Sequence, residues 1–119
     1  MNKFTNKQIE DTLNVINSSI INCERIQPKL KEGSPQLSLN KNRIKALYIS
    51  KALITNQIHD YKKEELPEAA AQITSIINKS KSGISHANEG SGTYTRFRKI
   101  IDSMTIALSF IEEAISDRK

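Results

Sequence analysis

Residues 93–118, TYTRFRKIIDSMTIALSFIEEAISDR, decide the fold of this chain because they form the longest regular apolar pattern in it. The pattern repeats at alternating steps of three and four residues through Tyr94, Phe97, Ile101, Met104, Leu108, Ile111 and Ile115. Residues at this spacing lie on one face of an α-helix. An apolar stripe of this length must be buried against other helices or a partner, so the segment predicts a helix that belongs to the core.

Three upstream segments show the same periodicity, and the expected helices span approximately 5–27, 39–62, 67–87 and 93–118. The first opens with Thr5 and Gln8 at the spacing of a capping box, in which each residue bonds the backbone N–H of the other. Pro28 disfavours helical backbone at the residue before it, which places the end of this helix near 27.

The second and third helices have weaker boundary signals. Ser38 or Asn40 is expected to cap the second helix, because both side chains can accept a bond from a free backbone N–H. Pro67 is tolerated in a first turn and marks the start of the third. Within that third helix Gly83 is expected to be a weak point that costs about 1 kcal/mol relative to Ala.

The composition fits a helical protein with few turns. The 119 residues include four Gly and three Pro, and no apolar run reaches the length of a membrane span. Four amphipathic helices with short connections pack most simply as an antiparallel up-and-down bundle. We therefore expect an all-α four-helix bundle in which residues 1–119 form one domain. The lone Cys23 is compatible with the reducing cytoplasm.

Charge is unevenly distributed along the chain, whose net charge is +5. In an up-and-down bundle, helices 2 and 4 begin where helices 1 and 3 end, so residues 24–45 and 79–99 would meet. These two segments hold eleven cations and three carboxylates, a net +8, which leaves −3 for the remainder. The predicted anion-binding residues are Lys41, Arg43, Lys45, Lys79, Lys81, Arg96, Arg98 and Lys99.

Several of these cations stand at helix N-termini, where the helix dipole makes positive charge mildly unfavourable. Clustering against a local preference indicates a functional site, and nucleic acid is the favoured partner, with an acidic protein as an alternative. The competing interpretation is a solvated charged surface with no partner.

A second candidate surface lies on the back of the last helix. Ile106 and Phe110, with Ala107 and Ala114 beside them, fall largely off the main apolar stripe, on the side expected to be exposed. They predict a partner interface, either a homodimer or a contact with another protein. The alternative is that a broad core or the 28–38 connection covers them.

The sequence carries no recognisable signature of catalysis. His59 and His86 have no residues at metal-ligand spacing, and the sequence contains no phosphate loop, dinucleotide fingerprint or nucleophile elbow. We therefore expect a non-enzymatic protein that needs no metal and no cofactor.

Two functions from different classes follow. One is a cytoplasmic binding or adaptor protein whose basic end docks nucleic acid. The other is a protein-interaction module that acts through helix 4, like a bacteriocin-immunity protein, an export chaperone or a phage inhibitor. The expected architecture resembles that of antibacterial-peptide immunity proteins, although no motif is shared. Attachment of the basic end to an anionic membrane is weaker, because no exposed apolar face is expected beside the charge.

Overall fold

The computed structural model describes residues 3–57 and 61–117, and these residues form four long helices. In chain order they are α1 (Asn6–Ile26), a 3-10 turn η1 (Gln27–Lys29), α2 (Pro35–Ile54), α3 (Glu65–Ser85) and α4 (Gly92–Asp117). The described residues contain no strand, which confirms the all-α prediction. None of these helices is apolar enough over a sufficient length to cross a membrane.

The capping box at the start of α1 is present as predicted. The Thr5 hydroxyl accepts a hydrogen bond from the Gln8 backbone N–H at 3.1 Å, and the Thr5 backbone N–H donates to Gln8 Oε1 at 2.8 Å. At its other end α1 stops at Ile26, just before the Pro-containing turn. Local sequence signals therefore define both ends of this helix.

The bounds of α2 differ from the expected 39–62 at both ends. The helix starts at Pro35, whose missing N–H is no loss in a first turn, and the Ser34 hydroxyl caps it by accepting from the Leu37 N–H at 3.2 Å. It ends at Ile54 because Asn56 adopts a left-handed backbone, with φ 55°. Tyr61 consequently lies outside the helix, and Ile58 is outside the described residues.

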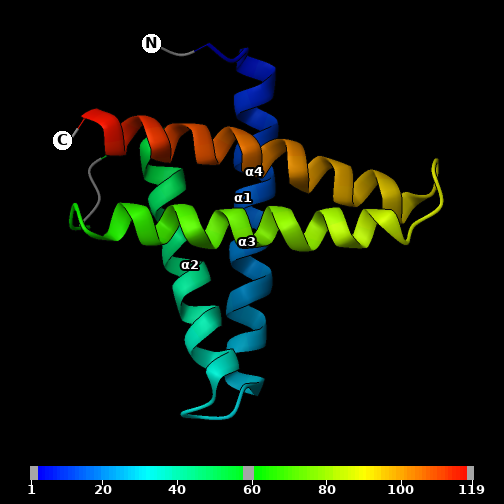
Figure 1. Ribbon diagram of the computed structural model, residues 1–119, viewed down its shortest axis with the longest axis horizontal. Coiled ribbons are helices and arrows are strands. Elements are labelled where there is room, and N and C mark those ends of the chain that lie inside the picture. The colour runs from blue at the N-terminus through cyan, green and yellow to red at the C-terminus, as the bar shows by residue number, and fades with distance from the viewer. Residues whose placement is uncertain (1–2, 58–60, 118–119) are drawn as a thin grey trace.

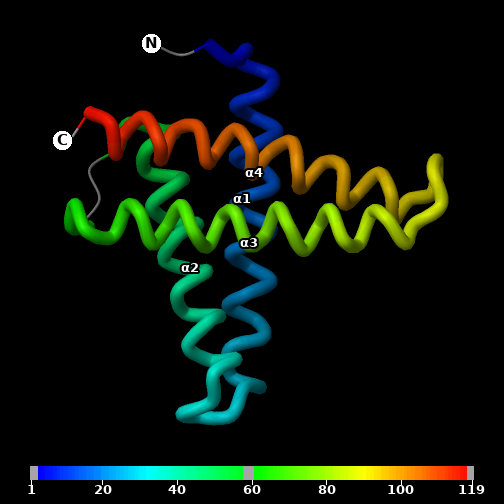
Figure 2. The backbone as a smooth tube through the Cα atoms, in the orientation of Figure 1, coloured from blue at the N-terminus to red at the C-terminus, as the bar shows by residue number. Residues whose placement is uncertain are grey.

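The four helices form two antiparallel hairpins, α1–α2 and α3–α4, and one hairpin lies across the other (Figures 1 and 2). The principal extents are 42 × 40 × 20 Å. A 26-residue helix is about 39 Å long, so two long dimensions and one short one fit two crossed layers. The helices pack together as a four-helix bundle, as predicted, but the hairpin axes are crossed where an aligned arrangement was expected.

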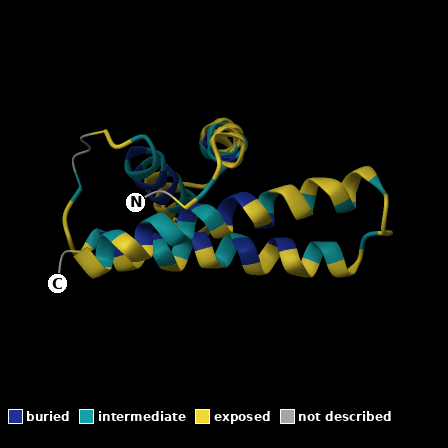
Figure 3. Cartoon of the chain, turned by 90° about the horizontal axis from the view of Figure 1, so that it is seen from above, coloured by how far each residue is buried: buried dark blue, intermediate teal, exposed yellow. Residues whose placement is uncertain are grey.

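The core lies where the hairpins cross, and every helix contributes to it. Its fully buried larger side chains are Ile16 of α1, Leu47 and Ile49 of α2, Leu66 and Ile73 of α3, and Met104 and Ile111 of α4. Figure 3 shows that buried residues gather toward the middle of the structure, whereas the end of the α3–α4 hairpin that holds its connection is mostly exposed. Three stripe residues that lie outside this region, Tyr94, Phe97 and Ile115, are only half-buried.

Four small side chains are buried on α2 and α4, two helices that contact each other across the layers. They are Ala46 and Ser50 of α2, and Ser103 and Ala107 of α4. Small residues let two helix axes approach closely at a crossing. The Ser50 hydroxyl donates to the Ala46 carbonyl of its own helix at 2.9 Å, so its burial leaves no unmet donor.

The expectation that Ala107 lies on an exposed side of helix 4 is wrong, because this residue is fully buried. The sequence pattern of α4 shows the single stripe that packs in its own hairpin. In the structure α4 contacts α1 and α2 as well as α3, so a second face is covered. Crossing thus buries more of α4 than its apolar periodicity indicates.

Beyond the crossing each hairpin continues as a two-helix arm with its connection at the tip (Figure 1). The α1–α2 arm comprises residues 21–45 and the α3–α4 arm comprises residues 79–100. Within an arm each helix packs mainly against one other helix, and the surface is correspondingly open. The two hairpins still meet at the base of each arm, where Lys45 pairs with Glu65 of α3 and Lys99 lines a cleft with residues of α1.

The close contact between the layers predicts the effect of enlarging Ala107. Ala107→Leu should lower the free energy of unfolding by about 1–3 kcal/mol, because added methyl groups overpack a filled site. Urea denaturation measures this change. Ala71→Leu, on the exposed surface of α3, is the matched control and should change stability little. Equal effects of the two substitutions would contradict a tight crossing at Ala107.

Candidate functional site

The structure divides the eight predicted anion-binding residues between the two arms. Three of them, Lys41, Arg43 and Lys45, belong to α2 in the α1–α2 arm. The other five are in the α3–α4 arm: Lys79 and Lys81 in α3, and Arg96, Arg98 and Lys99 in α4. Because the hairpins cross, their connections point in different directions (Figure 1). The single basic end expected from an aligned bundle is therefore replaced by two separate basic arms.

The α3–α4 arm carries five cations and one carboxylate, Glu89, a net +4. All five cationic side chains are exposed. Arg98 Nε lies 3.7 Å from Asp102 Oδ1, but both side chains are more than 60% exposed, so this pair contributes little. The other four cations have no ion pair among the described residues.

Positive charge surrounds this arm. Arg96 and Lys99 are three residues apart and share a face of α4, whereas Arg98 projects from another side. Lys79 and Lys81 are two residues apart on α3 and likewise lie on different sides. An anionic polymer can therefore meet cations from more than one direction of approach.

The start of α4 adds to the positive potential. The Ser91 hydroxyl accepts from the Tyr94 N–H at 3.1 Å, and the first turn of α4 contains no acidic residue. The positive end of the helix dipole is therefore not neutralised by a local carboxylate. Backbone N–H groups at such an end favour phosphate oxygens as ligands.

Lys45 differs from the other predicted residues because it forms an ion pair with the second hairpin. Its ammonium group pairs with the carboxylate of Glu65 at the start of α3, and Glu65 Oε1 also accepts from the Lys62 N–H at 2.9 Å. The hydrogen bond from Lys45 is the largest cause that lowers the pKa of Glu65. Lys45 thus joins the two hairpins, a contact that sequence reasoning missed because it depends on how the hairpins cross.

Arg43 is half-buried, and its Nε and Nη2 atoms are fully enclosed without a hydrogen-bond acceptor. The guanidinium lies close to Cys23 of α1. Burial is the main cause that raises the pKa of the Cys23 thiol, and the positive charge of Arg43 opposes that rise. Buried donors are nearly always hydrogen-bonded in folded proteins, so the unpaired Arg43 is unusual. Its burial also distinguishes it from the exposed cations.

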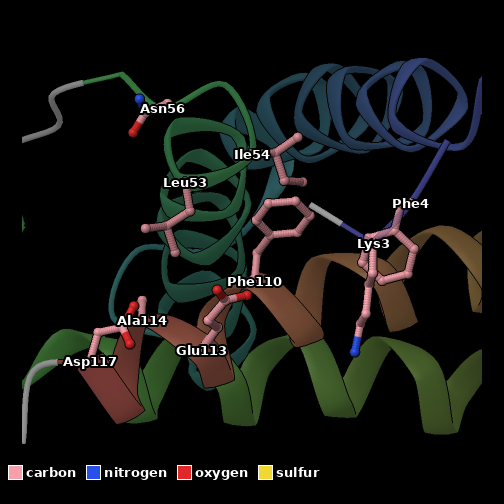
Figure 4. Close-up of a pocket in the computed structure, with 9 residues that line it drawn as sticks. All are labelled: Lys3, Phe4, Leu53, Ile54, Asn56, Phe110, Glu113, Ala114 and Asp117. Carbon is pink, nitrogen blue, oxygen red and sulfur yellow. The ribbon is translucent and has the colours of Figure 1, made fainter. Parts of the chain in front are cut away.

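The predicted interface residues Ile106 and Phe110 are both half-buried. The Phe110 ring centroid is 6.0 Å from that of Phe4, and these rings line a cleft of about 500 Å³ with Leu53 and Ile54 (Figure 4). Ile106 borders a smaller cleft, of about 390 Å³, next to residues of α1. Part of this surface is therefore covered from within the chain, and its use by a partner stays a prediction.

Among the described residues, no group of three His, Cys, Asp or Glu side chains is arranged to hold a metal ion. His86 is exposed at the end of α3, and His59 lies outside the described residues. Comparisons with protein families, with curated proteins and with solved structures found no match to this chain.

Gly83 has a packing role in the α3–α4 arm that the sequence does not reveal. A Cβ atom placed on it would lie 2.5 Å from Cζ of Phe97, so any larger residue would require the Phe97 ring to move. The absence of a side chain therefore lets the Phe97 ring pack against α3. Gly83 therefore makes room for the Phe97 ring as well as having a low helix propensity.

This contact predicts that Gly83→Ala lowers stability by about 1–3 kcal/mol through overpacking. In a Phe97→Ala background the sign should reverse, and the same substitution should add up to about 1 kcal/mol through helix propensity. A double-mutant cycle from urea denaturation measures both values. Stabilisation by Gly83→Ala in the wild-type background would contradict the close contact.

The Lys45–Glu65 pair predicts a pH-dependent contribution to stability. A carboxylate whose pKa is lowered on folding stabilises the protein above its unfolded pKa and loses that effect as the pH falls through the folded pKa. Lys45→Gln should therefore be destabilising at neutral pH, and the difference from wild type should shrink below pH 4.5, the ordinary Glu value. Thermal unfolding between neutral and acidic pH measures the difference. Lys41→Gln, on the same helix without an ion pair, is the control and should show no such trend.

Proposed function

We propose that this chain is a small non-enzymatic binding protein of the cytoplasm whose α3–α4 arm docks nucleic acid. The observation that carries the proposal is the group of four exposed and unpaired cations on this arm: Lys79, Lys81, Arg96 and Lys99. Cations without internal partners are free to neutralise phosphates and to release the counterions bound there.

The α3–α4 arm fits this role better than the α1–α2 arm, although each has a net charge of +4. In the α1–α2 arm Lys45 is paired with Glu65, and Arg43 is partly buried. The α3–α4 arm has all its cations exposed, and its exposed residues include no large hydrophobic side chain. Such a surface is typical of contacts to a phosphate backbone.

The distribution of charge favours binding with little sequence preference. The cations surround the arm instead of forming one row, and the exposed face includes no aromatic platform for stacking bases. Tyr94 and Phe97 are half-buried, and the Phe97 ring packs against Gly83. Phosphate contacts position a protein on nucleic acid but do not read its sequence.

Fluorescence anisotropy with labelled single- and double-stranded oligonucleotides of several sequences tests this function. Affinity should fall steeply with salt, with a slope in log K against log salt of about 0.9 per phosphate contact on duplex DNA. Arg96→Glu/Lys99→Glu should weaken binding to every sequence and reduce that slope by about two, because two phosphate contacts are lost.

Lys62→Glu/Lys63→Glu is the matched control, since it makes the same change in net charge at exposed positions outside both arms. It should retain most of the affinity. The proposal fails if no oligonucleotide binds at about 50 mM salt, or if the control pair weakens binding as much as the arm pair.

A further inference from the structure

A cleft of about 500 Å³ lies between three parts of the chain: the residues before α1, the end of α2 and the last turns of α4 (Figure 4). None of the eight predicted anion-binding residues lines it. Its volume falls within the range of about 300–1,000 Å³ that is typical of small-molecule sites. The size of the cleft therefore suits a compact ligand better than an extended polymer.

The uncharged surface of this cleft is mostly apolar. Leu53 and Ile54 of α2 and Ala114 of α4 provide aliphatic groups. The Phe4 and Phe110 rings provide aromatic groups, with their centroids 6.0 Å apart and their planes tilted by 31°. Such a lining favours a ligand with an apolar or aromatic body.

The chain itself places a cation on one of these rings. The Lys3 ammonium nitrogen lies 5.7 Å from the centroid of the Phe4 ring, a distance at which the negative face of a ring attracts a positive charge. Lys3 also lines the cleft. An ammonium group is thus already accepted at an aromatic wall of this site.

The charged groups of the cleft are mostly acidic. Glu113 and Asp117 contribute two carboxylates and Lys3 one ammonium, a net −1 on a chain whose net charge is +5. Two helix C-termini add to the negative potential, because Ile54 is the last residue of α2 and Asp117 is the last described residue of α4. The C-terminal end of a helix carries a partial negative charge. Charge therefore distinguishes this cleft from both basic arms.

These features together select one class of ligand. An anion would meet two carboxylates and the negative ends of two helix dipoles. A neutral apolar molecule would fill the cleft without using its charge. An organic cation uses both properties, since its apolar body contacts the walls while its positive group lies near the carboxylates and the ring faces.

We propose that this cleft is a binding site for a small aromatic amine in its ammonium form. The aromatic body packs against Phe110 and the aliphatic residues of α2, and the ammonium group lies beside Glu113 and Asp117. No cation of the α3–α4 arm lines the cleft, so this site does not rest on the proposed nucleic-acid surface, and the two proposals can fail independently.

Titrations with three indole compounds of similar size test the proposal. Tryptamine carries an ammonium group, tryptophol has a neutral hydroxyl at the same place, and indole-3-acetate is an anion. The chain contains no Trp, so the indole fluorescence of the ligand reports binding directly. Tryptamine should bind at least about fivefold more tightly than tryptophol, because the cation gains from the carboxylates and the ring faces. Indole-3-acetate should bind more weakly than either.

Substitutions in the cleft separate its charge from its shape. Glu113→Gln/Asp117→Asn should weaken tryptamine binding at least about fivefold and leave tryptophol binding within about twofold, because it removes charge and keeps shape. Ala114→Leu fills part of the cleft and should weaken both ligands at least about fivefold. Glu10→Gln/Glu112→Gln is the matched control, since it makes the same change in net charge at exposed positions that do not line the cleft. It should keep tryptamine affinity within about twofold.

Circular dichroism should show wild-type helix content in each variant, so that a loss of affinity reports the cleft and not unfolding. The proposal is overturned if tryptamine shows no binding up to about 1 mM, or if either of the other two compounds binds as tightly. It is also overturned if Ala114→Leu leaves tryptamine affinity unchanged, or if the control pair weakens binding as much as the cleft pair.

Discussion

The contact between the two helical hairpins determines the rest of this structure. The buried residues of the two helices that contact each other across the layers include small ones, Ala46 and Ser50 of α2 and Ser103 and Ala107 of α4, and small residues allow helices to approach closely. Around this contact the larger core residues of all four helices meet. A crossing confines full burial to the overlap, whereas aligned helices share a core along their whole length. The hairpins therefore have a common centre and separate ends.

Each arm must then be stabilised by its own two helices. In the α3–α4 arm the Phe97 ring packs against the backbone at Gly83, where the lack of a side chain leaves room for the ring. In the α1–α2 arm the Asn40 side-chain amide donates to the Cys23 carbonyl at 2.9 Å, which links α2 to the last turns of α1. The Lys45–Glu65 pair ties this arm back to the second hairpin. Local contacts thus replace the deep core that the arms lack.

The sequence was sufficient to predict the number of helices, the capping box of α1 and the apolar stripe of α4, because each depends on residues close together in the chain. The start of α2 was missed. The expected cap at Ser38 or Asn40 was wrong, although Ser34 followed by Pro35 is a local cap signal. The crossing was not readable in the same way. It depends on contacts between helices that are far apart in the sequence. Apolar periodicity alone does not show whether Ala107 faces solvent or packs against a second pair of helices.

That difference explains the outcome for the candidate site. The basic residues were predicted to form one end of the molecule, and that union depended on aligned hairpins. In the structure the basic residues lie on two separate arms. On the α1–α2 arm Lys45 is paired with Glu65 and Arg43 is partly enclosed. The expectation that no exposed apolar face accompanies the charge was wrong for the α1–α2 arm, where Ile26 and Leu39 are exposed. Ile26 and Leu39 lie on the same helix faces as core residues. They are exposed because the second hairpin crosses the first and does not extend over the arm.

Two arms with equal net charge need not bind the same ligand, because the affinity of a charged group depends on its burial and on the polarity of its neighbours. Exposed cations on a polar surface retain their water until a polyanion displaces counterions, so they favour a partner with dense, regular charge. A partly enclosed guanidinium such as that of Arg43 has already lost much of its water on folding, so it is less able than the exposed cations to exchange counterions for phosphates. The crossed hairpins hold these two kinds of surface on one rigid centre and point them in different directions.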